Sequence, residues 1–155
     1  MKKELQEKLF KSYPAIFRQK DLDRTVTAMC YGIACGDGWY DLIDQLCGEI
    51  QNQVDNVNRN RRNKLKLSAR TLVPVNFEEI TCEATQVKEK FGGLRFYVEG
   101  GDEYISGAIA MAESLSYQIC TECGCKSDVD TQKNRGWIYT LCKSCKSAMA
   151  DIKLR

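Results

Sequence analysis

The sequence predicts an α+β fold, in which helices pack on a small antiparallel sheet and a four-cysteine zinc ribbon follows toward the C-terminus. Three observations predict it: apolar residues recur at helical spacing, a strand-turn-strand pattern occupies residues 87–98, and two C-x2-C pairs begin at Cys120 and Cys142. With 155 residues, 43% of them apolar, the chain is long enough for one core and a small appendage. We expect a main domain at residues 1–117 and a ribbon with a short helix at residues 118–155.

Helical periodicity is the clearest signal in the chain. Four segments predict helices, at residues 2–11, 37–57, 102–117 and 143–154. Asp37 and Asp102 are the expected N-caps, because a short side-chain oxygen accepts a hydrogen bond from a free amide of the first helical turn. Residues 24–36 show no clear period.

Strand patterns lie between the second and third helices. Residues 80–98 predict a β-hairpin that turns at Gly92-Gly93. The parity of the apolar positions changes between Ala84 and Val87, which predicts a β-bulge there.

Two further segments have strand character. Residues 71–75 suit an edge strand or a loop because they include a proline. Residues 137–141 are aromatic and β-branched, and we expect them to form a ribbon hairpin with the polar stretch 126–135.

The spacing of Cys120, Cys123, Cys142 and Cys145 is typical of a structural zinc site. Gly124 directly follows the first pair, where a left-handed backbone lets the chain fold over the sulfurs. Four thiolates complete a tetrahedral Zn²⁺ and leave no open position for water or substrate, so we expect the metal to stabilise the fold. Two disulfides are the alternative, which the lack of a secretory signal disfavours.

The other cysteines offer a fifth candidate ligand and a possible second metal site. Cys125 is a fifth candidate ligand and is expected to be a spare. A second metal site would use Cys30, Cys35, Cys47 and Cys82. Cys47 and Cys82 fall on apolar faces, where burial in the core explains them equally well.

The chain has no histidine, which excludes His-containing metal sites and the Ser-His and Cys-His nucleophile pairs. No phosphate-binding or dinucleotide glycine motif appears, and no pair of carboxylates stands out from ordinary surface charge. We expect a protein without enzymatic activity.

Three stretches have distinctive wording: CGDGWYDLI at residues 35–43, ATQVKEKFGGLRFY at 84–97 and GWIYTLC at 136–142. In these stretches the chain resembles an uncharacterised family of small proteins encoded in tailed-phage and prophage genomes. The family has no established activity, so the resemblance implies a setting, the cytoplasm of a host cell. Small phage accessory proteins block host defence proteins, capture nucleotide signals or redirect transcription, and the resemblance implies a role of this kind.

The outward face of the hairpin is the candidate ligand surface, with Lys88, Lys90, Arg95 and Tyr97 near the double glycine. Arginine holds a phosphate with two hydrogen bonds while an aromatic ring stacks on a base, and Trp39 or Trp137 is a further candidate platform beside Tyr97. These residues predict a nucleotide-type anionic ligand, enclosed at the interface of a homo-oligomer. The alternative is an ordinary solvated sheet face.

The run from Arg59 to Lys66 is a second candidate surface, with five basic residues among eight. A helix C-terminus or a solvated loop explains such a run, and a phosphate-binding patch is the functional alternative. The net charge of +2 gives no overall basicity. No apolar stretch approaches the length of a membrane span and no signal peptide is present, so we expect a cytoplasmic protein without membrane contact.

Two functional hypotheses follow. The first is a non-catalytic phage-type accessory protein that sequesters a nucleotide signal or inhibits a host defence factor. The second is a zinc-ribbon regulator that binds nucleic acid through residues 59–66.

Overall fold

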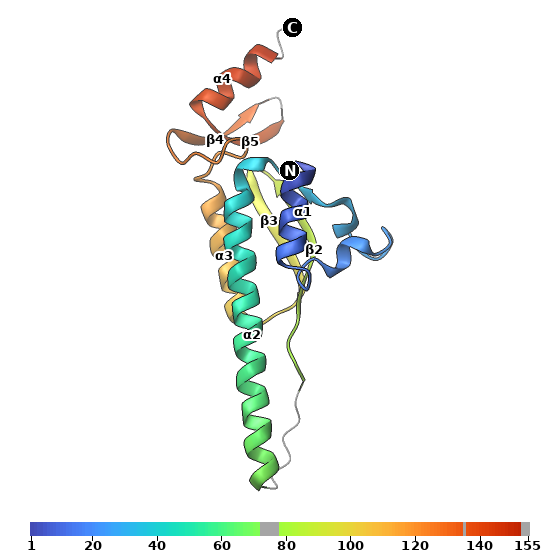
Figure 1. The fold of residues 1–155 in the computed structure, drawn as a ribbon. Coiled ribbons are helices and arrows are strands. Elements are labelled where there is room, and N and C mark those ends of the chain that lie inside the picture. The colour runs from blue at the N-terminus through green and yellow to red at the C-terminus, as the bar shows by residue number, and fades with distance from the viewer. Residues whose placement is uncertain (72–77, 135, 153–155) are drawn as a thin grey trace.

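The computed structural model describes residues 1–71, 78–134 and 136–152. The helices are α1 (Lys3–Ser12), α2 (Tyr40–Thr71), α3 (Glu103–Ser116) and α4 (Lys143–Ile152), with short 3-10 helices η1 (Arg18–Asp21), η2 (Met29–Tyr31) and η3 (Asp37–Trp39). The strands are β1 (Ile33–Ala34), β2 (Cys82–Lys90), β3 (Gly93–Gly100), β4 (Val129–Asn134) and β5 (Trp137–Cys142). The predicted α+β class is confirmed, and α2 and α3 run side by side with the ribbon at one end of the molecule (Figure 1).

The first sheet has the order β1-β2-β3 and is mixed, since β1 is parallel to β2 and β2 is antiparallel to β3. The predicted hairpin is confirmed, with Lys88 opposite Arg95. The predicted bulge is confirmed as well, because the register shifts between Ala84 and Gln86. The parallel strand β1 has only two residues, too few for a periodic signal in the sequence.

The hairpin turns at Phe91 and Gly92, which have positive φ angles of 56° and 79°. Two successive positive φ angles are the signature of the type I′ turn, whose twist matches that of the flanking strands. The turn lies one residue earlier than the sequence predicts, because Gly93 pairs with Lys90 as the first residue of β3.

The main core lies between the inner face of this sheet, α1 and the apolar stripe of α2. Trp39, Phe17 and Leu9 are fully buried in it, and the rings of Phe17 and Phe96 meet edge to face with centroids 6.4 Å apart. A separate small cluster under the ribbon contains the buried residues Cys120, Leu141 and Cys142. The division of the chain into domains at residue 117 stays a prediction.

The helix α2 is longer than its apolar period predicts. It continues past Val57 to Thr71 and takes the whole basic run into the helix, which there extends away from the body (Figure 1). The amide of Asn58 ties it to the returning chain by two bonds of 2.9 Å with the backbone of Ile80. Of the expected edge strand or loop at residues 71–75, Thr71 ends α2 and the rest lies outside the described residues.

The remaining helices match their predicted positions. Asp102 is confirmed as the N-cap of α3, since its Oδ1 accepts a hydrogen bond of 3.0 Å from the backbone amide of Ile105. None of the described helices has both the length and the apolar character of a membrane span.

Candidate metal centre and its surroundings

The four cysteines predicted to bind metal come together. The Sγ atoms of Cys120, Cys123, Cys142 and Cys145 all lie within 4.8 Å of one another, and those of Cys123 and Cys142 are 3.7 Å apart. A tetrahedron with metal–sulfur bonds of about 2.3 Å has edges of about 3.8 Å. The cluster therefore has the size and the donor set to hold one metal ion.

The backbone around the first pair folds into a tight turn. The amide of Gly124 donates to the carbonyl of Cys120 at 2.9 Å, and the amide of Cys120 donates to the carbonyl of Cys125 at the same distance. Gly124 has a φ of 75°, which confirms the expected left-handed conformation.

The second pair lies where β5 ends and α4 begins. Pairing of Val129 with Cys142 brings the end of the ribbon hairpin to the cluster, and the first turn of α4 places Cys145 beside it. The amide of Cys145 approaches Sγ of Cys142 at 3.4 Å. Local secondary structure thus brings each pair of sulfurs to the cluster.

Backbone amides also favour thiolates in this cluster. The amide of Cys145 lowers the pKa of the Cys142 thiol to about 6. The amide of Cys125 lowers the pKa of Cys123, while burial raises the pKa of Cys145. Each pair thus supplies one sulfur that is readily deprotonated, the form in which cysteine binds metal.

Cys125 is not a member of the four-sulfur group. Its Sγ lies 3.7 Å from the carbonyl oxygen of Ser127, in keeping with the expected spare role. Across residues 1–71, 78–134 and 136–152, the remaining cysteines form no second metal-binding group. Cys47 and Cys82 are buried in the main core, as their positions on apolar faces predict.

The turn before α2 packs directly on the first cysteine pair. The amide of Gly38 donates to the carbonyl of Thr121 at 2.9 Å. A methyl group on Gly38 would overlap the carbonyl oxygen of Cys120 and the amide of Gly124. Only glycine permits this close approach between the turn and the metal centre.

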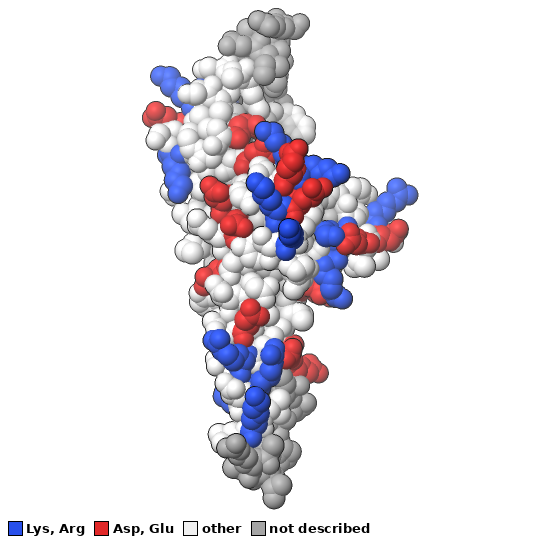
Figure 2. All heavy atoms as spheres, in the orientation of Figure 1, with Lys and Arg blue, Asp and Glu red and all other residues white. Residues whose placement is uncertain are grey.

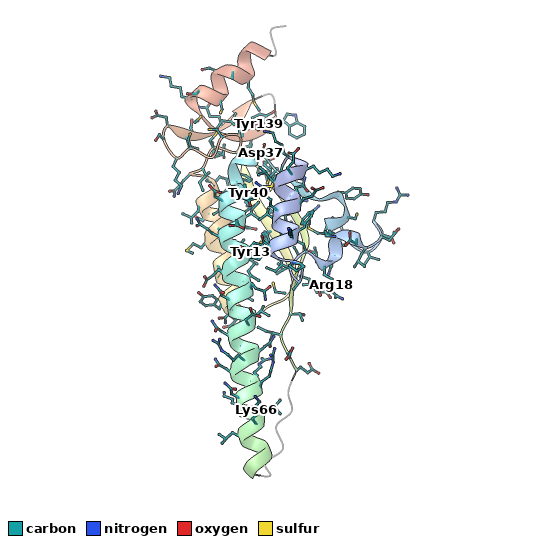
Figure 3. All side chains as sticks on the ribbon, viewed as in Figure 1. Tyr13, Arg18, Asp37, Tyr40, Lys66 and Tyr139 are labelled. Atoms are coloured by element: carbon teal, nitrogen blue, oxygen red, sulfur yellow. The ribbon has the colours of Figure 1, made fainter. Side chains whose placement is uncertain are left out.

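Asp37 and Trp39, on either side of Gly38, have other partners than the sequence suggests. The N-cap prediction for Asp37 is wrong, because its carboxylate accepts the backbone amide of Lys2 at 2.6 Å and pairs with the Lys2 ammonium at 3.2 Å. In Figure 3, Asp37 lies where α1 approaches the ribbon. The Trp39 indole is 0% exposed and donates to the carbonyl of Ile119 at 3.0 Å, so the expected stacking role of Trp39 is wrong.

The tip of the hairpin packs on the ribbon. The hydroxyl of Thr140 donates to the carbonyl of Gly92 at 2.6 Å, and a methyl group on Gly92 would lie 3.0 Å from the side chains of Ile138 and Thr131. A methyl group on Gly93 would overlap the ring of Tyr117. The double glycine therefore serves close packing within the chain.

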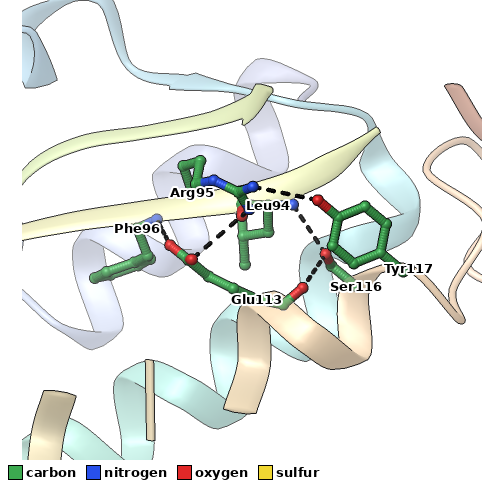
Figure 4. Close-up of polar contacts among 6 residues, drawn as sticks. All are labelled: Leu94, Arg95, Phe96, Glu113, Ser116 and Tyr117. Atoms are coloured by element: carbon green, nitrogen blue, oxygen red, sulfur yellow. Dashed lines mark hydrogen bonds and ion pairs between the residues drawn. The ribbon is translucent and has the colours of Figure 1, made fainter. Parts of the chain in front are cut away.

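Arg95 crosses the edge of β3 to α3 (Figure 4). Its guanidinium donates to the carbonyl of Leu94 at 2.6 Å and to the hydroxyl of Tyr117 at 3.2 Å, and it lies 3.7 Å from the carboxylate of Glu113. Glu113 also accepts the amide of Phe96 at 2.9 Å. Arg95 thus belongs to a network that joins α3 to the free edge of β3.

The other three hairpin residues lie at the surface, where Lys88 is half-buried and Lys90 and Tyr97 are exposed. Lys88 Nζ lies 5.7 Å from the ring centroid of Tyr97, which is 41% exposed. Lys90 Nζ lies 5.3 Å from the ring centroid of Phe91, which is 64% exposed. We call these four residues the hairpin face. Phe91 was missed in the sequence because it stands in the turn, where apolar periodicity ends.

Two polar residues that organise the centre were also missed. Thr140 interrupts an apolar strand pattern and is buried, and Glu113 follows an apolar run of α3, residues 108–112. A polar residue among apolar ones was the available signal, but its partners are distant in the sequence and had to be seen in three dimensions.

The basic run lies on the distal part of α2, where Lys and Arg side chains gather (Figure 2). Arg62 pairs with Glu79 at 2.7 Å, and Arg61 donates to the carbonyl of Glu78. Lys66 lies near the far end of the helix (Figure 3).

Comparison with known proteins finds no matching protein-family model, no curated protein of significantly similar sequence and no solved structure of significantly similar fold. Function must therefore be argued from the geometry of this chain.

Proposed function

We propose that this chain is a non-catalytic binding protein, in which a structural Zn²⁺ holds the ribbon and the hairpin face captures a nucleotide. The observation that carries this proposal is the pairing of a lysine with an exposed aromatic ring at two neighbouring places, Lys88 with Tyr97 and Lys90 with Phe91. A nucleotide matches both groups, because its base stacks on a ring and its phosphates attract ammonium groups.

Zinc is the metal that best suits the cysteine cluster. A tetrahedral set of four thiolates favours Zn²⁺ or iron, and the two C-x2-C turns have the spacing of structural zinc ribbons. A closed set of four sulfurs leaves no position for a reactive water, which supports the non-catalytic role.

The resemblance to phage accessory proteins supplies a biological setting for this binding. A small protein that removes a nucleotide from solution needs affinity and no turnover. Sequestration of a host nucleotide signal is the form of anti-defence activity that the hairpin face supports, and inhibition of a host defence factor is the other form.

Isothermal titration calorimetry with linear and cyclic nucleotides tests the proposal. We expect binding to the wild-type protein, about tenfold weaker binding to Tyr97→Ala and weaker binding to Lys88→Gln, because stacking and phosphate contacts each contribute 1 kcal/mol or more. Lys64→Gln is the matched control, since it removes an exposed lysine from the distal part of α2, at the end of this helix away from the ribbon (Figure 1). A wild-type protein that binds no nucleotide of the panel would exclude this function.

A second candidate function is nucleic-acid binding by the distal part of α2. The observation that favours it is the position of five basic residues on a helix that extends from the body (Figure 1), where a polyanion has access. Each phosphate contact makes the logarithm of the affinity fall with a slope of about 0.9 against the logarithm of salt concentration. Filter binding with DNA and RNA at two salt concentrations measures this slope, and no binding at low salt would exclude the regulator.

A further inference from the structure

A groove runs between α2 and α3 on the side of the molecule away from the sheet's core. It has a volume of about 520 Å³, and both helices line it. Its apolar wall includes Leu42, Leu46, Ala108, Met111 and Leu115. This surface belongs neither to the metal centre nor to the hairpin face.

Exposed apolar side chains border this groove. Met111 is 63% exposed, and Tyr104 and Leu115 are exposed as well. Gly107 lies between them on α3, and a methyl group added there would meet no atom within 4 Å. The absent side chain leaves the middle of the groove open, and the flexible Met111 beside it can adapt to an inserted side chain.

Hydrogen bonds hold the two helices that line the groove in place. The Tyr104 hydroxyl donates to the carboxylate of Glu49, which joins α3 to α2 across the groove. On its other side, α3 is held to β3 because Ser116 Oγ and Glu113 Oε1 accept the amides of Leu94 and Phe96, each at 2.9 Å. A preformed groove loses little conformational freedom when a partner binds.

The charged side chains that line the groove have one sign. The charged residues that line the groove are Glu49 and Glu103. Neither residues 36–58 nor residues 96–125 contain a lysine or arginine, although the whole chain has 23 of them. These two stretches thus carry carboxylates and no cations, and the groove presents carboxylates around an apolar floor.

We propose that this groove is a docking site for an amphipathic helix of a partner protein, whose apolar stripe is flanked by lysine or arginine. A helix of this kind places its apolar side chains against the floor and its cations beside Glu49 and Glu103. Self-association through this face would instead bring together two surfaces that carry carboxylates and no cations, which is unfavourable. The proposal does not rest on nucleotide binding, because the hairpin face lies on different elements.

Fluorescence anisotropy with two synthetic peptides tests the docking site. One peptide is an amphipathic helix of leucine and lysine, and the other has glutamate in place of each lysine. We expect the lysine peptide to bind at least about tenfold more tightly than the glutamate peptide. Equal affinities would overturn the proposal.

Variants at Gly107 test whether the lysine peptide binds in the groove. Gly107→Phe adds a ring to the lining of the groove at a position where an added Cβ meets no atom within 4 Å, and it should weaken binding of the lysine peptide by about tenfold or more, whereas Gly107→Ala should keep most of the affinity. Glu49→Lys combined with Glu103→Lys is an independent variant at the rim and should favour the glutamate peptide. Unchanged binding of the lysine peptide to both the Gly107→Phe and the rim variants would overturn the proposal.

Sedimentation analysis of the protein alone tests whether a second copy of the chain occupies the groove. A wild-type dimer that becomes a monomer on Gly107→Phe would show that a second copy fills the groove, and the proposed partner would be wrong. Nucleotide binding by the same variants is measured in parallel. Because Gly107 lies on α3 whereas Lys88 and Tyr97 lie on β2 and β3, loss of peptide binding with retained nucleotide binding distinguishes the two sites.

Discussion

The hydroxyl of Thr140 donates a hydrogen bond of 2.6 Å to the carbonyl of Gly92, which joins the ribbon to the tip of the hairpin. The Thr140 hydroxyl also lies 2.8 Å from that of Thr131, and the Thr140 carbonyl accepts the amide of Thr121 at 3.0 Å. One buried residue thus connects the hairpin, the ribbon strands and the first cysteine pair. Through these contacts, a metal ion bound at the cysteines would support the position of the hairpin face.

Thr140→Val tests this connection. The change keeps the shape of the side chain and leaves the Gly92 carbonyl without its donor, so we expect a loss of about 1–3 kcal/mol in the free energy of unfolding. Urea denaturation measures it. Thr81→Val, at an exposed position, is the control and should change stability by less than about 0.5 kcal/mol. Equal effects of the two changes would argue against a special role for Thr140.

Cys142→Ser tests the metal centre. Loss of one of four ligands should reduce the bound metal, measured by atomic emission, and lower the melting temperature. A chelator should lower the melting temperature of the wild-type protein in the same way. Cys125→Ser is a matched control two residues from Cys123, and it should keep full metal content because Cys125 is outside the four-sulfur group. The reverse pattern would assign the fourth ligand to Cys125.

Gly38→Ala tests the packing of the turn on the first cysteine pair. The added methyl group would overlap backbone atoms of Cys120 and Gly124, so the turn must move, at an expected cost of about 1–3 kcal/mol. Gly107→Ala, where space is open within α3, should instead stabilise the protein by about 0.5–1 kcal/mol. Chemical denaturation of both variants measures the two changes in the free energy of unfolding, which should have opposite signs. Stabilisation by Gly38→Ala would contradict the observed contact.

The carboxylate of Asp37 makes stability depend on pH. The hydrogen bond from the Lys2 amide lowers the pKa of Asp37 in the folded protein, so the unfolded chain binds a proton more readily. The stabilising contribution is complete above the unfolded pKa of about 4 and is lost as pH falls through the lower folded pKa. We expect the stability difference between wild type and Asp37→Asn to shrink over this acidic range. A difference that stays constant from pH 6 to pH 2 would contradict the assignment.

Substitution of Arg95 distinguishes a structural role of this residue from a role in ligand binding. Because its guanidinium contacts Leu94, Tyr117 and Glu113, Arg95→Lys should destabilise the protein by about 1 kcal/mol, since lysine cannot reproduce the planar set of donors. Nucleotide affinity, measured by calorimetry below the melting transition, should change less than in Tyr97→Ala. A large loss of nucleotide affinity with unchanged stability would instead show that Arg95 is a ligand-binding residue, as the sequence predicts.

The sequence alone determined the features that depend on local patterns. Apolar spacing located α1, α3 and the start of α2, alternation located the hairpin with its bulge, and the spacing of Cys120 to Cys145 defined the metal cluster. These signals are local because periodicity and tight turns involve residues close together in the chain.

Only the tertiary structure decided what the glycine-containing turns are for within the molecule. Gly38 and Gly92 allow backbone contacts with residues far away in the chain, and Trp39 and Arg95 find partners in the core and on α3. The end of α2 and the groove beside Gly107 were likewise set by long-range packing. A sequence pattern reports which side chains are apolar or small, but the space that each one fills depends on elements that only folding brings together.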